Sequence, residues 1–402
     1  MRLTYWLLFA IYAANYLDRQ IFSVMLEAIR QELVLGDVEM GLLSGLAFSL
    51  TYGLASIPAA VWASIGNRRN LVACSALIWG LMTMMTGLAT GFFQLFVARA
   101  AIAAAEAASI PASHSILSDS THSSGRVKLF GHFTSASAVG GLFAVLIGGV
   151  VGHFYGWRVA MICAGLVGIL PGLLLFLVPE PKRDYPARRP GEPYRYTVLG
   201  TALQAIYANR RARLMFSAET INQIVLSGAI AWYPAFLVRQ HDFSQIQAAA
   251  TASVGGLLAI IGTITTSRII ARLTDRDRDW LSLAPSLVIL LGKPFSLVFL
   301  LAGDPMLALV AFVVPAALSL STYPPTLTVL HETVSPVERP VASAMLISLA
   351  TVLGLGVGPT LVGLLSEAIG GPISLNLALV CLQGFGLVSA YLYWRASRAL
   401  SQ

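Results

Sequence analysis

Long, uninterrupted apolar segments constrain this chain more than any other feature of its sequence. Residues 71–88 and 142–151, for example, contain no charged side chain. A helix needs about 20 apolar residues to cross the hydrocarbon core of a bilayer. Across all 402 residues, 56% are hydrophobic and 11% are charged, whereas soluble domains carry about 25% charged residues. The sequence therefore predicts an integral membrane protein.

The same segments predict helices and not a membrane β-barrel, whose short strands would alternate apolar and polar residues. Gly, Pro and charged residues interrupt the apolar runs and divide the chain into twelve expected spans. These lie near residues 4–26, 38–64, 71–88, 91–116, 128–151, 157–178, 212–238, 246–271, 281–301, 305–331, 341–366 and 372–394. We expect an all-α fold with six-helix bundles at 1–178 and 212–402, joined by a basic cytoplasmic linker at 179–211.

Weak internal similarities in the sequence support two similar halves. The fifth and eleventh spans are both rich in glycine, which lets helix backbones approach closely. Repeats of this kind place the substrate site between the halves, near the middle of the membrane. The linker contains a possible short amphipathic helix around residues 198–209.

The distribution of basic residues predicts the orientation of the chain. With a cytoplasmic N-terminus, only Arg30, Arg158 and Arg239 of the 26 Lys and Arg residues fall on the outer side, and three more lie within or at the edge of spans. Cytoplasmic loops of membrane proteins carry such an excess of basic residues. We therefore expect a bacterial-type inner membrane protein with both termini cytoplasmic. The net charge of +7 then reflects topology and attraction to anionic lipids, and no nucleic-acid partner is expected.

Four charged residues inside the expected spans are the main candidates for function. Asp18 and Arg19 lie in the first span, and Arg99 and Glu106 in the fourth. A charge at a helix centre costs about 2.5–3.5 kcal/mol, so each one needs a reason. With a rise of about 1.5 Å per residue, Asp18, Arg19 and Arg99 lie toward the outer half of the membrane, and Glu106 lies about 10 Å closer to the cytoplasm.

Two interpretations of Glu106 remain open. Its neighbours in sequence are alanines, and an apolar environment raises the pKa of a carboxyl whereas a nearby arginine lowers it. A carboxyl whose environment changes during transport can load and release a proton, and Asp18 is a second candidate for this role. Alternatively, Glu106 forms a structural ion pair with Arg19 or Arg99 that only fixes helix packing.

Weaker candidates lie in the second half. Glu219 and Asn222 form a polar patch in the seventh span near Trp232, which indicates either a cavity lining or an interfacial anchor. Tyr323 and the two prolines after it break the tenth span, and broken helices often line transport sites. The three cysteines fall in apolar runs without metal-ligand spacing, and we expect no metal or other cofactor.

Several short segments carry a resemblance to a known family. They are Asn15-Tyr16-Leu17-Asp18-Arg19 in the first span, Gly41-Leu42-Leu43 and Phe48-Ser49-Leu50-Thr51-Tyr52 in the second, Arg99 followed by Glu106-Ala107 and Pro111 in the fourth, and Gly156-Trp157-Arg158 with Pro179-Glu180 around the sixth. Together they resemble the major facilitator superfamily along the whole chain and, within it, the spinster branch.

The resemblance implies twelve helices in two bundles, alternating access and coupling to protons. Spinster relatives in animals carry lysolipids, so an amphipathic anion of lysolipid type is the implied substrate. Asp18 and Glu106 would be protonation or gating residues. Arg19 and Arg99 would be partners for these carboxylates or for an anionic headgroup, and Asn15 belongs to the same signature.

The chain departs from the superfamily in its cytoplasmic gating loops. After the second span, Ala60, Ser64, Ile65 and Asn67 replace the usual Gly, Asp, Arg and Gly. After the eighth span, Ala271 stands where an aspartate is expected. Gating ion pairs that use those aspartates are therefore in doubt. The charged residues that remain as gating candidates are Arg68, Arg69, Arg272, Asp275 and Arg276.

Three classes of function compete, none of them enzymatic, since no nucleophile or phosphate-binding motif is present. The first is a monomeric, proton-coupled exporter of an amphipathic anion. The second is a proton-coupled symporter of a small organic anion, which would need a more polar pocket. The third is a membrane lipid-binding protein without transport activity, which would not need Glu106 inside an apolar span.

Overall fold

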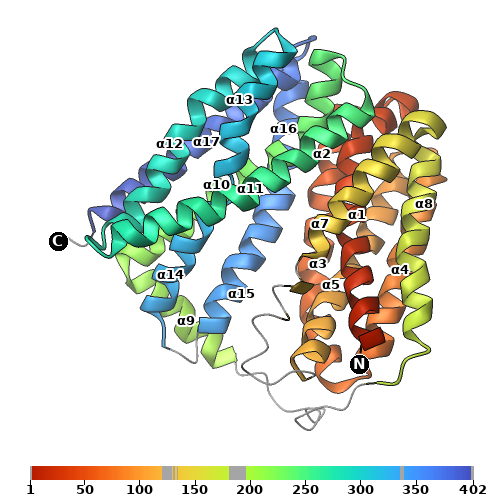
Figure 1. The fold of residues 1–402 in the computed structure, drawn as a ribbon, viewed down its shortest axis with the longest axis horizontal. Coiled ribbons are helices and arrows are strands. Elements are labelled where there is room, and N and C mark those ends of the chain that lie inside the picture. Colours follow the sequence, from red (N-terminus) through yellow and green to blue (C-terminus); the bar gives the residue numbers. More distant parts are fainter. Residues whose placement is uncertain are drawn as a thin grey trace. The chain divides into compact units, whose positions relative to one another are not determined.

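The computed structural model describes residues 2–119, 129, 132–133, 135–180, 196–335 and 339–399. Helices occupy nearly all of this part of the chain, and no β-strand occurs in it (Figure 1). Ten helical segments within it are long and apolar enough to cross a membrane. The predicted all-α membrane fold is therefore confirmed.

The helices follow the expected order of spans. Those of the first half are α1 (Arg2–Leu33), α2 (Asp37–Ser44), α3 (Leu46–Ile65), α4 (Arg68–Gly87), α5 (Phe92–Asp119), α7 (Ala136–Phe143), the π-helix η1 (Ala144–Val151) and α8 (Gly152–Leu175). Those of the second half are α9 (Tyr196–Ala208), α10 (Arg210–His241), α11 (Gln245–Thr274), α12 (Trp280–Leu301), α13 (Pro305–Leu318), α14 (Tyr323–Thr333), α15 (Arg339–Leu349), the π-helix η2 (Ala350–Leu355), α16 (Gly356–Ile369) and α17 (Ser374–Ser397).

Two local predictions are confirmed. The tenth span is broken, because α13 ends at Leu318 and α14 begins at Tyr323, directly before two prolines that suit the first turn of a helix. The linker contains the predicted short helix, α9. The first helix is longer than expected, because α1 continues for two turns beyond residue 26 through a charged segment.

Two compact units make up the chain. One consists of Met1–Glu192 and Leu237–Ser253, and the other of Pro193–Phe236 and Val254–Gln402. Helices α10 and α11 contribute to both, because the end of α10 and the beginning of α11 belong to the first unit.

Glycines bring equivalent helices together within each unit. A Cβ atom on Gly140 of α7 would lie 2.3 Å from the carbonyl oxygen of Ala13 on α1. In the second unit, a Cβ atom on Gly358 of α16 would lie 2.4 Å from the carbonyl oxygen of Ile224 on α10. Both glycines belong to spans that contain a π-helical segment, η1 and η2. The fifth span packs on the first, and the eleventh on the seventh, so the expected similarity of the halves extends to their packing.

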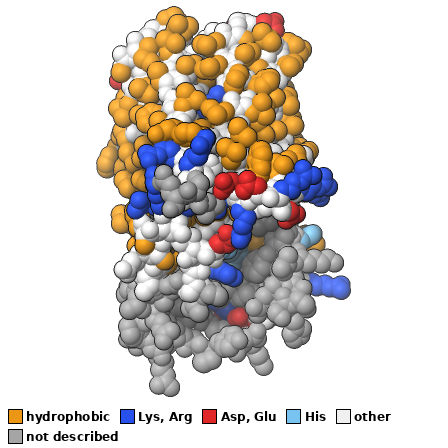
Figure 2. All heavy atoms as spheres, turned by 90° about the vertical axis from the view of Figure 1, so that its left-hand side faces the viewer, with side chains coloured by type: hydrophobic (Ala, Val, Ile, Leu, Met, Phe, Trp, Pro, Cys, Tyr) orange, Lys and Arg blue, Asp and Glu red, His pale blue; other side chains and the backbone are white. Residues whose placement is uncertain are grey.

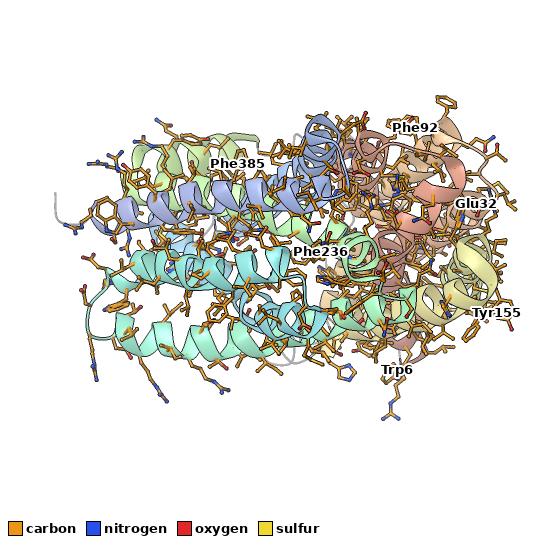
Figure 3. All side chains as sticks on the ribbon, turned by 90° about the horizontal axis from the view of Figure 1, so that it is seen from above. Trp6, Glu32, Phe92, Tyr155, Phe236 and Phe385 are labelled. Carbon is orange, nitrogen blue, oxygen red and sulfur yellow. The ribbon has the colours of Figure 1, made fainter. Side chains whose placement is uncertain are left out.

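The outer surface is strongly apolar. One face of the molecule carries a wide area of hydrophobic side chains, bordered by a group of charged ones (Figure 2). Trp6, Tyr155 and Phe385 are at least 43% exposed, whereas Phe236 is fully buried (Figure 3). Large apolar side chains facing outward are destabilising in water but favourable against lipid. This surface agrees with a bilayer as the solvent.

We expect Gly140→Ala to lower the melting temperature of the protein, because the new methyl group forces α7 away from α1. Overpacking of this kind costs about 1–3 kcal/mol. The matched control is Gly141→Ala, since a Cβ atom there has no heavy atom within 4 Å and alanine favours the helix. Thermal unfolding in detergent measures both variants. Equal stability of the two would contradict the close approach of the helices.

Candidate functional site

The four charged residues predicted from the sequence lie on two helices of the first unit. Asp18 and Arg19 come from α1, and Arg99 and Glu106 from α5. Glu106 is 0% exposed, and the side chains of Asp18 and Arg99 are also buried. The four form two ion pairs between the helices: Arg19 Nε lies 3.0 Å from Glu106 Oε2, and Arg99 Nη1 lies 3.7 Å from Asp18 Oδ2.

Helix geometry explains this pairing. Successive residues on a helix point about 100° apart, so Asp18 and Arg19 turn to different partners. Arg99 and Glu106 are seven residues apart, which is about two turns, and therefore share one face of α5. Of the two arginines that the sequence left open as partners for Glu106, the structure shows Arg19.

Aromatic rings enclose both guanidinium groups. The Arg19 guanidinium carbon lies 5.2 Å from the ring centres of Phe48 and Tyr52 on α3. The Arg99 guanidinium carbon lies 4.4 Å from the ring centre of Phe22 and 4.9 Å from that of Phe48. A cation over an aromatic face is stabilised by about 0.5–2 kcal/mol, depending on its desolvation. The ring of Phe48 therefore lies beside the arginines of both ion pairs.

Thr83 of α4 completes the surroundings of Asp18. Its hydroxyl hydrogen-bonds Asp18 Oδ1. Sequence analysis missed Thr83, and it did not assign Phe22 a role. The pair Phe48 and Tyr52, four residues apart and therefore on one helix face, was visible within the family-like segment of the second span.

Several polar atoms of the site keep unused hydrogen-bonding capacity. Within the described residues, no hydrogen-bond partner is found for the buried atoms Asn15 Nδ2, Asp18 Oδ2, Arg19 Nη2 and Glu106 Oε1. Buried polar groups are normally satisfied, so a group of exceptions at one place points to function. The site offers donors for an anionic group on Asn15 and Arg19 and acceptors for a proton on the two carboxylates.

The gating-loop arginines of the first half are held by the ends of the fourth and sixth spans. Arg68 is buried and pairs with Asp119, at 2.5 Å, and with Glu180, at 3.3 Å. Arg69 donates to the carbonyl oxygens of Phe176 and Val178, and its backbone N–H donates to Glu180. Arg68 therefore ties the start of α4 to the end of α5 and to the segment that follows α8, and Arg69 ties it to that same segment. A gating role for them stays a prediction.

In the second half, the candidate gating residues are exposed. The side chains of Arg272, Asp275 and Arg276 form no ion pair within the described part of the chain. The structure does not bring them into a site of their own, and their gating role also stays a prediction.

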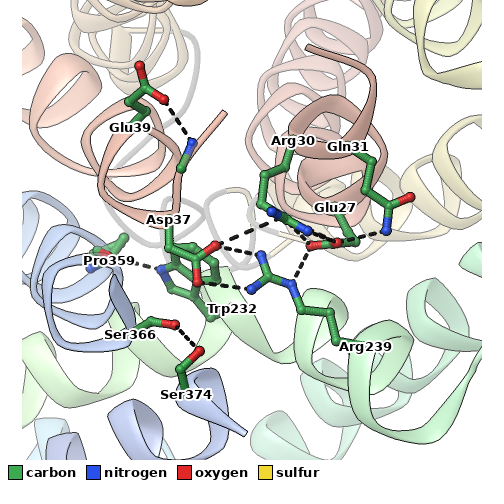
Figure 4. Close-up of polar contacts among 11 residues, drawn as sticks. Glu27, Arg30, Gln31, Asp37, Glu39, Trp232, Arg239, Pro359, Ser366 and Ser374 are labelled. Carbon is green, nitrogen blue, oxygen red and sulfur yellow. Dashed lines mark hydrogen bonds and ion pairs between the residues drawn. The ribbon is translucent and has the colours of Figure 1, made fainter. Parts of the chain in front are cut away.

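The weaker candidates of the second unit occupy separate positions. Asn222 donates to Thr322 Oγ1 at 3.1 Å. Trp232 is 0% exposed, and its Nε1 donates to the carbonyl oxygen of Pro359 at 2.9 Å (Figure 4). It therefore packs α10 against α16 and does not line an open cavity. Tyr323 is partly buried at the break between α13 and α14.

A second charge network, missed by the sequence, lies at the far ends of α1 and α10 (Figure 4). Arg239 donates to both carboxylate oxygens of Asp37, at 2.8 and 2.9 Å, and to Glu27 at 2.5 Å. Arg30 donates to the same Glu27 at 2.8 Å. Arg30 and Arg239 were both placed on the outer side by the distribution of basic residues. The pair of Arg30 and Glu27 is local, three residues apart on α1, but both partners of Arg239 lie about 200 residues away in sequence, so no local pattern could reveal them.

The third arginine placed on the outer side also has an acidic partner. Arg158 donates to Glu32 Oε1 at 2.8 Å, and Trp157 donates to Glu32 Oε2 at 2.6 Å. These hydrogen bonds, that from Arg158 above all, lower the pKa of the Glu32 carboxyl. The segment Gly156-Trp157-Arg158 therefore connects the sixth span to the end of the first (Figure 3 labels Glu32).

Among the described residues, no group of three His, Cys, Asp or Glu side chains could hold a metal ion. Apolar helices with few, paired and deeply buried charges define a polytopic membrane transport protein. The family model of the Major Facilitator Superfamily matches residues 8–299. The chain belongs to this superfamily of membrane transporters.

Similar proteins place it more narrowly. An "MFS-type efflux pump" of Mycolicibacterium smegmatis is 29% identical over 392 residues, which cover 95% of this chain and 89% of the pump. The sphingosine-1-phosphate transporter SPNS2 of Danio rerio is 25% identical over 385 residues, covering 88% and 74% of the two chains. A bacterial homologue of the human lysosomal transporter Spinster, in an inward-facing, unoccupied conformation, superimposes with a TM-score of 0.86 at 25% identity, covering 98% of this chain and 96% of the homologue. The resemblance to spinster proteins is confirmed.

We expect Thr83→Val to destabilise the protein, because Asp18 loses its hydroxyl partner without a change in side-chain volume. Side-chain hydrogen bonds between membrane helices contribute about 0.6 kcal/mol on average and up to about 1.7 kcal/mol. Thr83→Ser keeps the hydroxyl and is the matched control. Thermal unfolding measures both variants, and a serine variant as unstable as the valine variant would show that the methyl group matters instead.

Proposed function

We propose that this transporter is a proton-coupled exporter of an amphipathic anion, of lysolipid type, that works by alternating access. The proposal rests on the burial and the hydrogen-bond partners of the Glu106 carboxylate. The carboxylate is fully buried, is paired with Arg19 through one oxygen, and keeps the other oxygen free of any partner in the described residues.

Charge balance supports a link between proton and anion. The two carboxylates and two guanidinium groups of the site sum to zero when all are ionised. An anionic headgroup bound to the free Nη2 of Arg19 makes the sum negative, which favours protonation of Glu106 or Asp18. Conversely, a proton on Glu106 releases Arg19 for the anion. Binding of a proton and binding of the anion therefore favour each other, so the two cross the membrane in the same direction, and export proceeds when the outward gradient of the anion exceeds the inward gradient of protons.

The surroundings of the arginines support an amphipathic substrate. The guanidinium groups of Arg19 and Arg99 offer charge, while the rings of Phe22, Phe48 and Tyr52 offer an apolar surface directly beside it. A headgroup followed by a hydrocarbon tail matches this combination. Export is supported by the likeness to an efflux pump, and a lysolipid substrate by the likeness to a sphingosine-1-phosphate transporter.

The same proposal includes location and organisation. We place the protein in a bacterial-type inner membrane, with both termini cytoplasmic and protons and membrane lipids as partners. Its six-helix bundles would be residues 1–178 and 212–402, joined by the basic linker 179–211. The clustering of basic residues in the expected cytoplasmic loops supports this topology.

We expect Glu106→Gln to abolish the dependence of transport on a pH gradient. Glutamine keeps the shape of the side chain and an oxygen that accepts from Arg19, so the variant should still fold. It cannot take up a proton, so imposed pH gradients of either sign should no longer change the rate. Release of a lysolipid from loaded proteoliposomes measures this rate.

The matched control is Glu332→Gln, which removes one negative charge from the surface pair with Arg278. It should respond to the gradient as the wild type does. A Glu106→Gln variant with unchanged proton dependence would exclude Glu106 from coupling.

We expect lysophospholipids with a phosphate headgroup to raise the melting temperature of the purified protein more than small dicarboxylates do. The reason is that only the lipid uses both the arginines and the aromatic rings. Thermal unfolding with each compound in the same detergent tests this. Stabilisation by dicarboxylates alone would favour a symporter of small organic anions, and the Phe48→Leu variant should lose the preference for the lipid.

A further inference from the structure

The second unit contains a buried carboxyl group that the transport site does not use. Glu219 lies on α10, nine residues after the helix begins, and is 0% exposed. Within the described residues, no Lys, Arg or His side chain forms an ion pair with it. Glu219 therefore differs from Asp18 and Glu106, each of which has an arginine.

The partners of Glu219 are neutral. Gln223, one turn further along α10, donates its Nε2–H to Glu219 Oε1 at 2.7 Å. The hydroxyl of Tyr393 on α17 lies 2.7 Å from Glu219 Oε2. The Tyr393 hydroxyl also lies 2.7 Å from Thr326 Oγ1 on α14, and Thr326 Oγ1 lies 2.8 Å from the carbonyl oxygen of Thr322. All of these side chains except that of Gln223 are buried.

Counting hydrogens along this chain indicates the state of Glu219. Four contacts join these groups: Glu219 to Tyr393, Tyr393 to Thr326, Tyr393 to the hydroxyl of Thr322, and Thr326 to the carbonyl oxygen of Thr322, which can only accept. The three hydroxyl groups supply one hydrogen each. Three hydrogens cannot fill four hydrogen bonds, so an ionised Glu219 leaves one contact without a hydrogen. A proton on Glu219 Oε2 supplies the fourth.

The energy of burial favours the same state. A charged side chain inside an apolar span is costly unless an opposite charge lies beside it. An arginine offsets that cost for Glu106, whereas two neutral donors offset it much less for Glu219. A neutral carboxylic acid also fits both neighbours: one oxygen accepts from Gln223, and the other lies 2.7 Å from the Tyr393 hydroxyl oxygen, which can accept the acid's hydrogen.

We propose that Glu219 is a second proton-binding site of the transporter, occupied in this conformation and held by a directed chain of hydroxyl groups from Glu219 through Tyr393 and Thr326 to the carbonyl of Thr322. The site is independent of Glu106, since it lies in the other unit and shares no residue with the paired charges. It adds one bound proton to those of the transport site.

Infrared spectroscopy of the purified protein at neutral pH tests the proposal. A protonated carboxyl gives a carbonyl absorption that an ionised one lacks and that moves to lower frequency in D₂O. We expect this absorption in the wild type and in Glu106→Gln, and its loss in Glu219→Gln. Identical carboxyl absorption in wild type and Glu219→Gln would overturn the proposal. The measurement does not require transport, so its outcome is separate from that of the Glu106 experiment.

The hydroxyl chain is tested by Tyr393→Phe, which also serves if Glu219→Gln does not fold. Removal of the phenol oxygen deprives the carboxyl of its acceptor, so its absorption should move to higher frequency. Tyr391→Phe, on the exposed side of the same helix, is the matched control and should leave the absorption in place. An absorption unchanged by Tyr393→Phe would exclude the chain, and with it the hydrogen count that assigns the proton to Glu219.

Discussion

The first unit depends on ion pairs between charged side chains that are shielded from water. Each of Asp18, Arg99 and Glu106 would be costly alone in an apolar span, and each has an opposite charge on a neighbouring helix. The pairs require the charged faces of α1 and α5 to point at each other, with α3 and α4 supplying Phe48 and Thr83 around them. Buried ion pairs add little net stability compared with apolar packing. The presence of four such charges on two helices therefore agrees with the role in proton binding that we propose for the two carboxylates.

Much of the fold could be predicted because lipid enforces simple rules on sequence. The length of each apolar segment predicts a span, and Gly and Pro mark breaks such as the one before Tyr323. Small residues mark places where helices cross closely, such as Gly140 of α7 against α1. The end of α1 was predicted about seven residues too early, because its last two turns carry Glu27, Arg30 and Glu32. Those charges resemble a loop in sequence, yet they form helix because Arg239 and Arg158 pair with them.

The sequence predicted which residues form the site, but it did not predict which of them pair with each other. A charged residue within an apolar run is visible in any sequence, so Asp18, Arg19, Arg99 and Glu106 could be found. Which arginine meets which carboxylate depends on how α1 and α5 are rotated about their axes, and sequence fixes that rotation only loosely. Neutral partners such as Thr83 and Tyr393 are harder still, because a hydroxyl in a membrane helix usually bonds its own backbone, as Thr326 does with Thr322.

The buried carboxyl groups of the two units have different partners, arginines in the first unit and neutral side chains in the second, although the helices of the two units pack alike. In the first unit, Asp18 and Glu106 are electrically balanced when ionised, and protonation leaves an arginine in excess that attracts an anion. In the second, Glu219 is balanced when protonated, and loss of the proton leaves an isolated negative charge among neutral donors. In the proposed mechanism, protonation therefore frees an arginine for an anion in the first unit and removes an isolated negative charge in the second.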